Sequence, residues 1–455
     1  MEGHTPLEHE VQLEAACLDT IGNAHGSTRN PPILPPELHE LIVHQLKDEK
    51  WALKRCTYTC RLHWYLARKI LLKRMAFKFY KDSTPTDEFL EVLQASPEIV
   101  DYVERLTIRE NTYYHFRSTQ DYKRDDSLSR VIQALTNVVH LVLRDLDNFW
   151  QWKPSLVLTV MAKCDSLRSL TLLRINDLPL KIFDHLQNLE SINLVHVHFH
   201  DNDPAVRAAQ ASPASPYRIK NMKLVDAYIK YGIPIHSFLV QRQFGVGHLE
   251  TLTINMFTTK TPGRSAEEDC EHAKLLVRAH ANTLKVLKFA LSSKAPVRFL
   301  ENSEPVFDVS TMPLLESLSL AGVVCNPECY MESGSVGLRF LSSHLETFPT
   351  LAGRTFKSIT LSAAIYDVGY VMDYHLDFEA LKHFETLIVE RILHQTESLC
   401  IEFMISELEE PDRRRGGIKQ LKRRLPTLHA LNLLKFTDEF ESSGFASDIE
   451  SFWWL

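Results

Sequence analysis

The sequence LRSLTL at residues 167–172 and the sequence LESINL at residues 189–194 share one pattern. Apolar residues stand at the first, fourth and sixth positions of both. The last two of these are two residues apart, so their side chains point to the same side of a β-strand. The two copies start 22 residues apart (189 minus 167). A short pattern that returns at such a spacing is typical of a repeat protein.

The same pattern recurs along the chain after residue 100, at intervals of roughly 22 to 44 residues. Its eleven copies are Val103-Leu106-Ile108, Val138-Leu141-Leu143, Leu167-Leu170-Leu172, Leu189-Ile192-Leu194, Ile219-Met222-Leu224, Leu249-Leu252-Ile254, Leu284-Leu287-Phe289, Leu315-Leu318-Leu320, Phe356-Ile359-Leu361, Phe384-Leu387-Val389 and Leu428-Leu431-Leu433. Helical stretches precede many of them, such as residues 267–280 and 377–383. One strand and one helix cannot bury their apolar faces alone, so the units are expected to stack.

The predicted fold class is therefore α/β, with a leucine-rich-repeat-like βα solenoid and a curved parallel sheet over residues 81–455. The repeat is degenerate, because most copies lack the asparagine or cysteine usually expected three residues beyond the pattern. Residues 1–30 are interpreted as a flexible leader. Residues 31–80 contain a proline-rich helix start and apolar residues at three- and four-residue steps, which predict three short helices.

A distinct motif lies in residues 31–80. It reads LPPEL at residues 34–38, followed by Ile42 and Leu46, and it continues with ALKRC at residues 52–56 and TCRLHWYLAR at residues 59–68. This motif closely resembles the F-box, with Thr59 at a position where valine is commoner. The match covers about 42 residues, and the repeat-bearing remainder resembles that of divergent fungal F-box proteins.

The resemblance implies a substrate receptor of an SCF-type ubiquitin ligase, without catalytic activity of its own. A Skp-type adaptor would bind the F-box and connect it to cullin and RING subunits, while the solenoid would hold a target protein. The matching positions assign adaptor contact to Leu34, Pro35, Leu38, Ile42, Leu46, Leu53, Cys60 and Trp64. For Leu41, Leu53 and Cys56, a role in holding the three helices together is an equal alternative.

Composition narrows the cellular context. The net charge of −7 gives no reason to expect nucleic-acid binding. Eight widely spread cysteines favour free thiols in a reducing compartment. The acidic start of the chain is unlike a signal peptide, and no long apolar run predicts a membrane helix. We therefore expect a cytoplasmic or nuclear protein. The basic run at residues 413–424 is interpreted as a solvated, salt-bridged helix, with nuclear import as the alternative.

Signatures of catalysis and metal binding are weak. The sequence contains no phosphate-binding loop, dinucleotide fingerprint, nucleophile elbow or zinc-protease helix, and we expect no cofactor. His196, His198 and His200 alternate along a predicted strand and so share one face. No carboxylate or cysteine is convincingly spaced beside them, so polar edge residues are favoured over a metal site.

Side chains between the buried positions of each repeat are expected to face the open side of the sheet. Cations at such positions suggest a target with acidic or phosphorylated groups, and they are Arg105, Arg109, Arg144, Lys223 and Lys288. The alternative functions are a repeat-based interaction scaffold with no link to ubiquitin transfer and an enzyme with a cryptic site.

Overall fold

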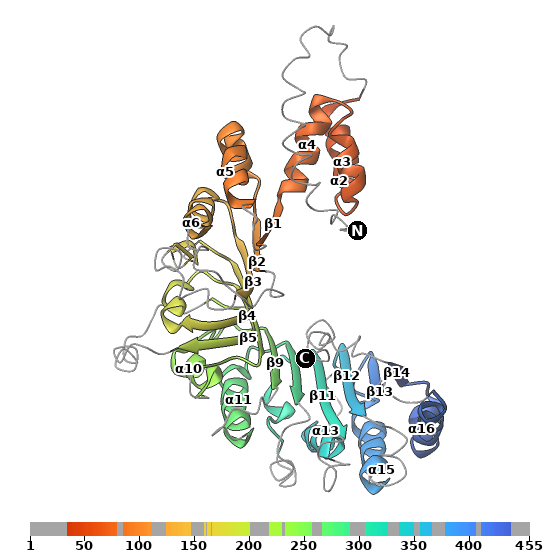
Figure 1. The fold of residues 1–455 in the computed structure, drawn as a ribbon. Helices are drawn as coiled ribbons and strands as arrows, with labels where there is room; N and C mark the ends of the chain where they lie inside the picture. Colours follow the sequence, from red (N-terminus) through yellow and green to blue (C-terminus); the bar gives the residue numbers. More distant parts are fainter. Residues whose placement is uncertain are drawn as a thin grey trace. The chain divides into compact units, whose positions relative to one another are not determined.

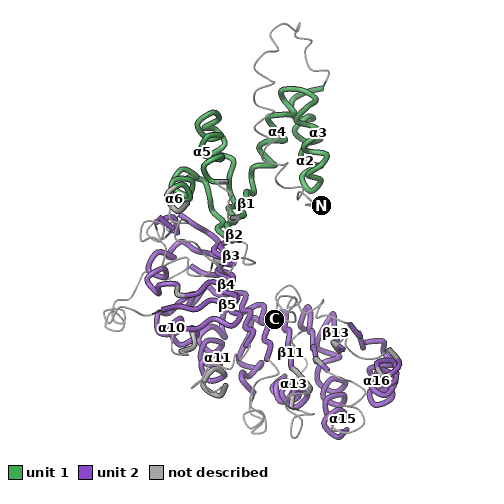
Figure 2. The backbone as a smooth tube through the Cα atoms, in the orientation of Figure 1, with its two compact units in different colours: residues 1–141 green, residues 142–455 purple. Residues whose placement is uncertain are grey.

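The computed structural model describes residues 34–79, 85–110, 124–146, 159–160, 162–164, 166–200, 218–229, 233–256, 266–291, 305–325, 336–349, 355–365, 378–405 and 411–437. The expected leader at residues 1–30 lies outside these ranges. The chain divides into two compact units, residues 1–141 and residues 142–455, coloured separately in Figure 2.

Three short helices begin the described part of unit 1. They are α2 (Pro36–Gln45), α3 (Lys50–Cys56) and α4 (Arg61–Leu72). Proline at the first helical position suits the start of α2, because its missing N–H would have no partner there. The backbone N–H of His63 donates to the Cys60 Sγ atom and caps α4. Val43, Leu53 and Ala67, one from each helix, form the buried centre of this small domain.

The rest of unit 1 builds the first strands and their helices. Its elements are β1 (Arg74–Phe79), α5 (Pro85–Ala95), η1 (Pro97–Asp101), β2 (Arg105–Glu110) and α6 (Arg124–Ala134). Strands β1 and β2 are parallel. A buried hydrogen bond of 2.7 Å between the Thr86 and Ser127 hydroxyls connects α5 to α6. Strand β1 lies within the range that the sequence assigned to the F-box, so the parallel sheet begins before residue 81.

The described part of the chain contains fourteen strands, and those after β2 are β3 (His140–Leu146), β4 (Ser169–Pro179), β5 (Ser191–His200), β6 (Asn221–Val225), β7 (Tyr228–Ile229), β8 (Ile233–Pro234), β9 (Thr251–Met256), β10 (Val286–Leu291), β11 (Ser317–Cys325), β12 (Ser358–Ile365), β13 (Leu399–Ile405) and β14 (Leu434–Thr437). In unit 2 the order β4-β5-β6-β9-β10-β11-β12-β13-β14 follows the chain. All pairs along this path are parallel, whereas the short β7 and β8 pair antiparallel at its margin.

Helices alternate with these strands in unit 2. They are η3 (Leu180–His185), α10 (Ile235–Gln241), α11 (Ala266–His280), η5 (Val309–Thr311), α13 (Val336–Glu346), α15 (Phe378–Leu387), η7 (Ile388–Ile392), α16 (Pro411–Arg424) and α17 (Pro426–Ala430). Figure 1 shows α10, α11, α13, α15 and α16 along one side of the sheet. Apolar side chains between the two layers are buried, among them Phe289, Phe348 and Phe403. A repeat-like parallel α/β architecture is therefore confirmed.

The repeat pattern predicted most strands correctly and two incorrectly. The second and third apolar residues of the first nine copies lie in strands β2 to β6 and β9 to β12. The copy that starts at Phe384 lies instead in α15 and η7, and the copy that starts at Leu428 begins in α17. Between these two copies, the strand that joins the sheet is β13, at residues 399–405. Residues three apart also share a face of a helix, so the pattern alone could not separate the two structures.

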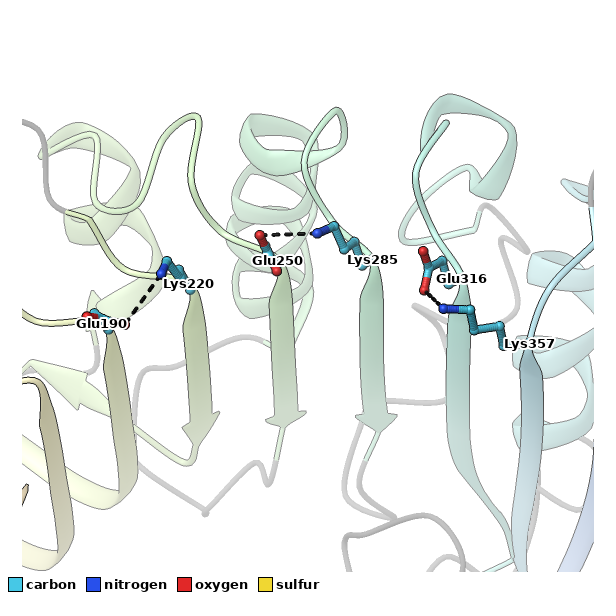
Figure 3. Close-up of polar contacts among 6 residues, drawn as sticks. All are labelled: Glu190, Lys220, Glu250, Lys285, Glu316 and Lys357. Carbon is cyan, nitrogen blue, oxygen red and sulfur yellow. Dashed lines mark hydrogen bonds and ion pairs between the residues drawn. The ribbon is translucent and has the colours of Figure 1, made fainter.

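A ladder of alternating charges precedes the strands of unit 2. We use the term charge ladder for the residues at the equivalent position before strands β4, β5, β6 and β9 to β13, which are Arg168, Glu190, Lys220, Glu250, Lys285, Glu316, Lys357 and Glu397. Ammonium and carboxylate groups are 3.4 Å apart in the pair Glu190–Lys220, 3.2 Å in Glu250–Lys285 and 2.6 Å in Glu316–Lys357 (Figure 3). The hydrogen bond between the last two residues lowers the pKa of Glu316 and raises the pKa of Lys357.

The backbone joins neighbouring members of this ladder as well. The carbonyl of Glu250, for example, accepts hydrogen bonds from the N–H groups of Lys285 and Val286, at 2.8 and 2.9 Å. The ladder therefore lies where the parallel pairing of neighbouring strands begins. A shift of one residue would separate the charges and would also turn apolar side chains out of the core.

The basic run at residues 413–424 lies in helix α16, as the sequence suggested. Arg415 forms an exposed ion pair of 2.7 Å with Asp412, one turn earlier. None of the helices in the described ranges is long and apolar enough to cross a membrane.

Candidate functional site

Large exposed apolar side chains are concentrated on the three helices at the start of unit 1. Of the twelve in the described part of the chain, seven fall within residues 34–65. We call these seven the helical apolar surface, and they are Leu34, Leu38, Leu41, Ile42, Trp51, Tyr58 and Tyr65. Such a concentration is uncommon on a protein surface unless the surface has a partner.

The front part of the predicted adaptor site belongs to this surface or adjoins it. Leu34, Leu38 and Ile42 are 39, 44 and 44% exposed, and Pro35 is exposed as well. Leu38 and Ile42 are four residues apart on α2 and therefore lie on the same side of that helix. The carbonyl of Pro35 accepts hydrogen bonds from the backbone N–H groups at the start of α2, which holds Leu34 and Pro35 at the helix start.

The remaining predicted contact residues occupy several environments. Leu53 is only 1% exposed and lies in the three-helix core, so its side chain holds the domain together. Leu46 packs partly against this core. Cys60 is exposed, but its sulfur caps α4. Trp64 is half-buried, and the guanidinium of Arg68 lies 4.7 Å from the centre of its ring. The structure therefore separates exposed candidates from residues with internal roles.

Two histidines connect α2 to α4. The Nδ1 atom of His39 and the Nε2 atom of His63 are 2.8 Å apart, and the Thr59 hydroxyl lies 2.8 Å from the Nδ1 atom of His63. Burial and the neighbouring His39 lower the pKa of His63. Neutral imidazoles can share a proton in this contact, whereas two protonated rings would repel each other.

Contacts between α4 and the residues around η1 join the three helices to the rest of unit 1. The rings of Tyr65 and Tyr102 meet edge to face, with centres 6.0 Å apart, and Arg68 pairs with Glu98 at 3.6 Å. Burial and the hydrogen bond with Tyr65 raise the pKa of Tyr102 to about 12. Helix α4 is thus supported from the side of the sheet by an aromatic contact and an ion pair.

The sequence prediction missed three aromatic members of the helical apolar surface. Trp51 is 72% exposed and Tyr58 is 70% exposed, and the Arg55 guanidinium lies 4.8 Å from the centre of the Trp51 ring. Tyr65 is the third. Tyr65 lies within the motif at residues 59–68 but was not assigned to adaptor contact, and Trp51 and Tyr58 lie outside the quoted stretches of the motif. Tryptophan and tyrosine are enriched in binding interfaces, which would have been a usable signal.

The predicted target-binding cations fall into different surroundings. In unit 1, Arg105 is exposed and Arg109 is half-buried, both on β2. In unit 2, Arg144 is not a free cation, because its Nε atom donates to the buried carboxylate of Asp145 at 3.0 Å. Lys223 and Lys288 are half-buried and lie on either side of Thr253 in the strand register.

Four residues with a left-handed backbone conformation lie at the places where Arg144 and His196 meet acidic side chains. Asp145, Arg174, His196 and Asp226 each lie two residues beyond the repeat pattern of their unit and have φ angles of 57°, 52°, 52° and 47°. Asp145 also forms an ion pair with Arg174, and the Nδ1 atom of His196 lies 3.3 Å from the Asp226 carboxylate. After Arg174 and His196, the next residue of β4 and of β5 is buried and apolar, at the position where asparagine was expected.

The three alternating histidines do not converge. His196 faces Asp226, whereas the ring of His198 lies 4.0 Å from that of Tyr228. Within the described ranges, no group of three or more histidine, cysteine, aspartate or glutamate side chains could hold a metal ion.

Comparisons with known proteins do not identify this chain. No protein-family model matches its sequence, and no curated protein matches it significantly.

Proposed function

We propose that this protein is the substrate-recognition subunit of an SCF-type E3 ubiquitin ligase. In this proposal the helices at residues 36–72 bind a Skp-type adaptor, which brings cullin and RING subunits, and the parallel α/β repeats bind a target protein. The protein itself carries out no chemistry. The F-box resemblance of residues 34–68 is the origin of this proposal.

The observation that supports it best is the helical apolar surface. Three helices form a core of only a few fully buried residues, and they leave seven large apolar side chains exposed. A domain this small gains little stability from its own core, and covering such a surface with a partner helix would add to it. The exposed part of the surface includes Leu34, Leu38 and Ile42, which the F-box motif had assigned to adaptor contact.

The test is a binding measurement between the purified full chain and a purified Skp-type adaptor. We expect a complex in the wild type, and we expect Leu38→Asp combined with Ile42→Asp to weaken it at least about 100-fold, because a charge would enter an apolar contact at two points. Leu34→Asp with Pro35→Ala tests the helix start in the same way. Circular dichroism checks that each variant folds.

A matched control places the same change elsewhere. Leu314 is 50% exposed in unit 2, and Leu314→Asp is expected to leave adaptor binding unchanged. If the wild type forms no complex with the adaptor, or if the double variant binds as tightly as the wild type, the ligase proposal is wrong. Partners that co-purify without the adaptor would then favour the scaffold function.

A further inference from the structure

Strands β1 and β2 place four cations on one face of the sheet in unit 1. The register sets Arg74 beside Arg105 and Lys78 beside Arg109. The alternate residues face the other way, and Phe77 is buried there. We call Arg74, Lys78, Arg105 and Arg109 the basic quartet.

This arrangement is unfavourable for the strand pair alone. Neighbouring strands are only about 4.8 Å apart, and like charges directly opposite each other destabilise a sheet. Among the described residues, Arg74, Lys78 and Arg105 have no ion-pair partner. The contrast is the position just before, where Lys73 pairs with Glu104 at 2.9 Å. Within the described ranges, the charge of Lys73 at the start of this strand pair is therefore offset, whereas the charges of Arg74, Lys78 and Arg105 are not.

The quartet also lies beside a strand edge. In the described part of the chain, β1 has hydrogen bonds with β2 alone, so its other edge can accept an added strand. An extended segment that pairs with such an edge places alternate side chains on the same face of the sheet. Its acidic residues would then lie next to Arg74 and Lys78.

We propose that an extended acidic segment of a partner protein docks along β1, held by the basic quartet. The partner's carboxylate or phosphate groups pair with the guanidinium groups of Arg74 and Arg105 and the ammonium group of Lys78, which have no ion-pair partner among the described residues. The side chains between the two cation pairs are Ala76 and Thr107, so this face offers no aromatic platform on which bases of RNA would stack. This proposal deepens the receptor function and rests on it only in regarding the acidic segment as part of a target.

The probe is a fluorescein-labelled peptide of alternating glutamate and valine, with a second peptide in which phosphoserine replaces the central glutamate. Fluorescence anisotropy with the full chain is expected to show binding that weakens as salt rises. The variant Lys78→Glu with Arg105→Glu is expected to bind at least about tenfold more weakly. The control Arg130→Glu reverses an exposed cation on α6 and is expected to bind like the wild type.

Stability gives a second readout, because the same substitutions turn two repulsive pairs into attractive ones. The double variant is therefore expected to unfold at the same temperature as the wild type or at a higher one. A loss of binding together with a lower unfolding temperature would point to damage of the fold and would count against the proposal.

The remaining outcomes separate this proposal from its rivals. Equal binding by the double variant would overturn it, as would binding to phosphatidylserine vesicles or single-stranded RNA without binding to the acidic peptides. The variant with Leu38→Asp and Ile42→Asp is expected to lose the adaptor and keep the peptide. Failure of peptide binding with an intact adaptor complex would therefore reject the docking site and leave the receptor function standing.

Discussion

The burial of His344 allows us to predict how acid changes the stability of this protein. His344 on α13 has no exposed surface. Its Nε2 atom accepts a hydrogen bond from the backbone N–H of Val306 at 3.0 Å, and its Nδ1 atom lies 2.7 Å from the carbonyl of Phe340. The ring is therefore neutral, with its proton on Nδ1. Burial lowers the pKa of His344 from 6.5 to about 4, although the bond to the Phe340 carbonyl acts in the opposite direction.

The direction of the effect on stability follows from proton binding. Between pH 6.5 and about pH 4, the unfolded chain binds a proton at His344 and the folded chain does not. The unfolded state is therefore favoured as the pH falls through this range, and the stabilisation present above pH 6.5 is lost. Each unit of pKa corresponds to about 1.4 kcal/mol, so the loss at this one residue is about 3 kcal/mol.

Urea-induced unfolding of wild type and His344→Gln, followed by circular dichroism at about pH 7 and about pH 4.5, measures this effect. The variant is expected to be less stable at neutral pH, because the ring contacts with Phe307 and Phe340 are lost, but to lose less stability in acid. His280, whose pKa burial also lowers to about 4, contributes equally to both proteins.

The control is His383→Gln, because His383 is an exposed histidine paired with Glu346 in the same unit. This variant is expected to lose stability in acid as the wild type does. Equal losses in the wild type and in His344→Gln would refute the reasoning.

Three further substitutions test the repeats of unit 2. Lys285→Glu would place one carboxylate between Glu250 and Glu316 in the charge ladder, and it is expected to lower the free energy of unfolding by on the order of 1 kcal/mol, less at high salt. Phe183→Ala empties a fully buried site among three phenylalanine rings, with an expected cost of about 3–5 kcal/mol in urea unfolding. Glu385→Ala removes the carboxylate that accepts two backbone N–H groups at the start of α17, at 2.8 and 3.0 Å, and is expected to cost about 1–3 kcal/mol in the same assay. A change within experimental error in any of these variants would contradict the corresponding contact.

Most strands of the sheet could be predicted, because a parallel strand covered by helices has apolar residues at a recognisable spacing. Apolar pairs such as Leu170 and Leu172 recur at the same position in nine copies of the repeat pattern, and chance does not reproduce this spacing so often. The prediction was wrong where a helix offers the same spacing, as at Phe384. Strand β13 lacked a matching first residue, although Ile401 and Phe403 alternate as a strand requires.

The candidate sites were less predictable, because they depend on which residues become neighbours. Arg105 could be placed on a sheet face from its position in the repeat. Its neighbour Arg74 could not, because β1 had not been recognised and the register between the two strands is set by their packing. Arg144 was expected to be available, but a left-handed turn brings the carboxylate of Asp145 to it. The local sequence indicates which residues tend to form a strand or a helix. Which charges become neighbours depends on how the strands pair in the folded sheet.

The charge ladder has a consequence for how such an array can grow or shrink. Removing one repeat, residues 250–284, would bring Lys220 next to Lys285 in the charge ladder. Removing two repeats, residues 250–315, would instead bring Lys220 next to Glu316. Insertions obey the same parity rule. Modules of this sheet should therefore be gained, lost or transplanted more readily in even numbers than in odd ones.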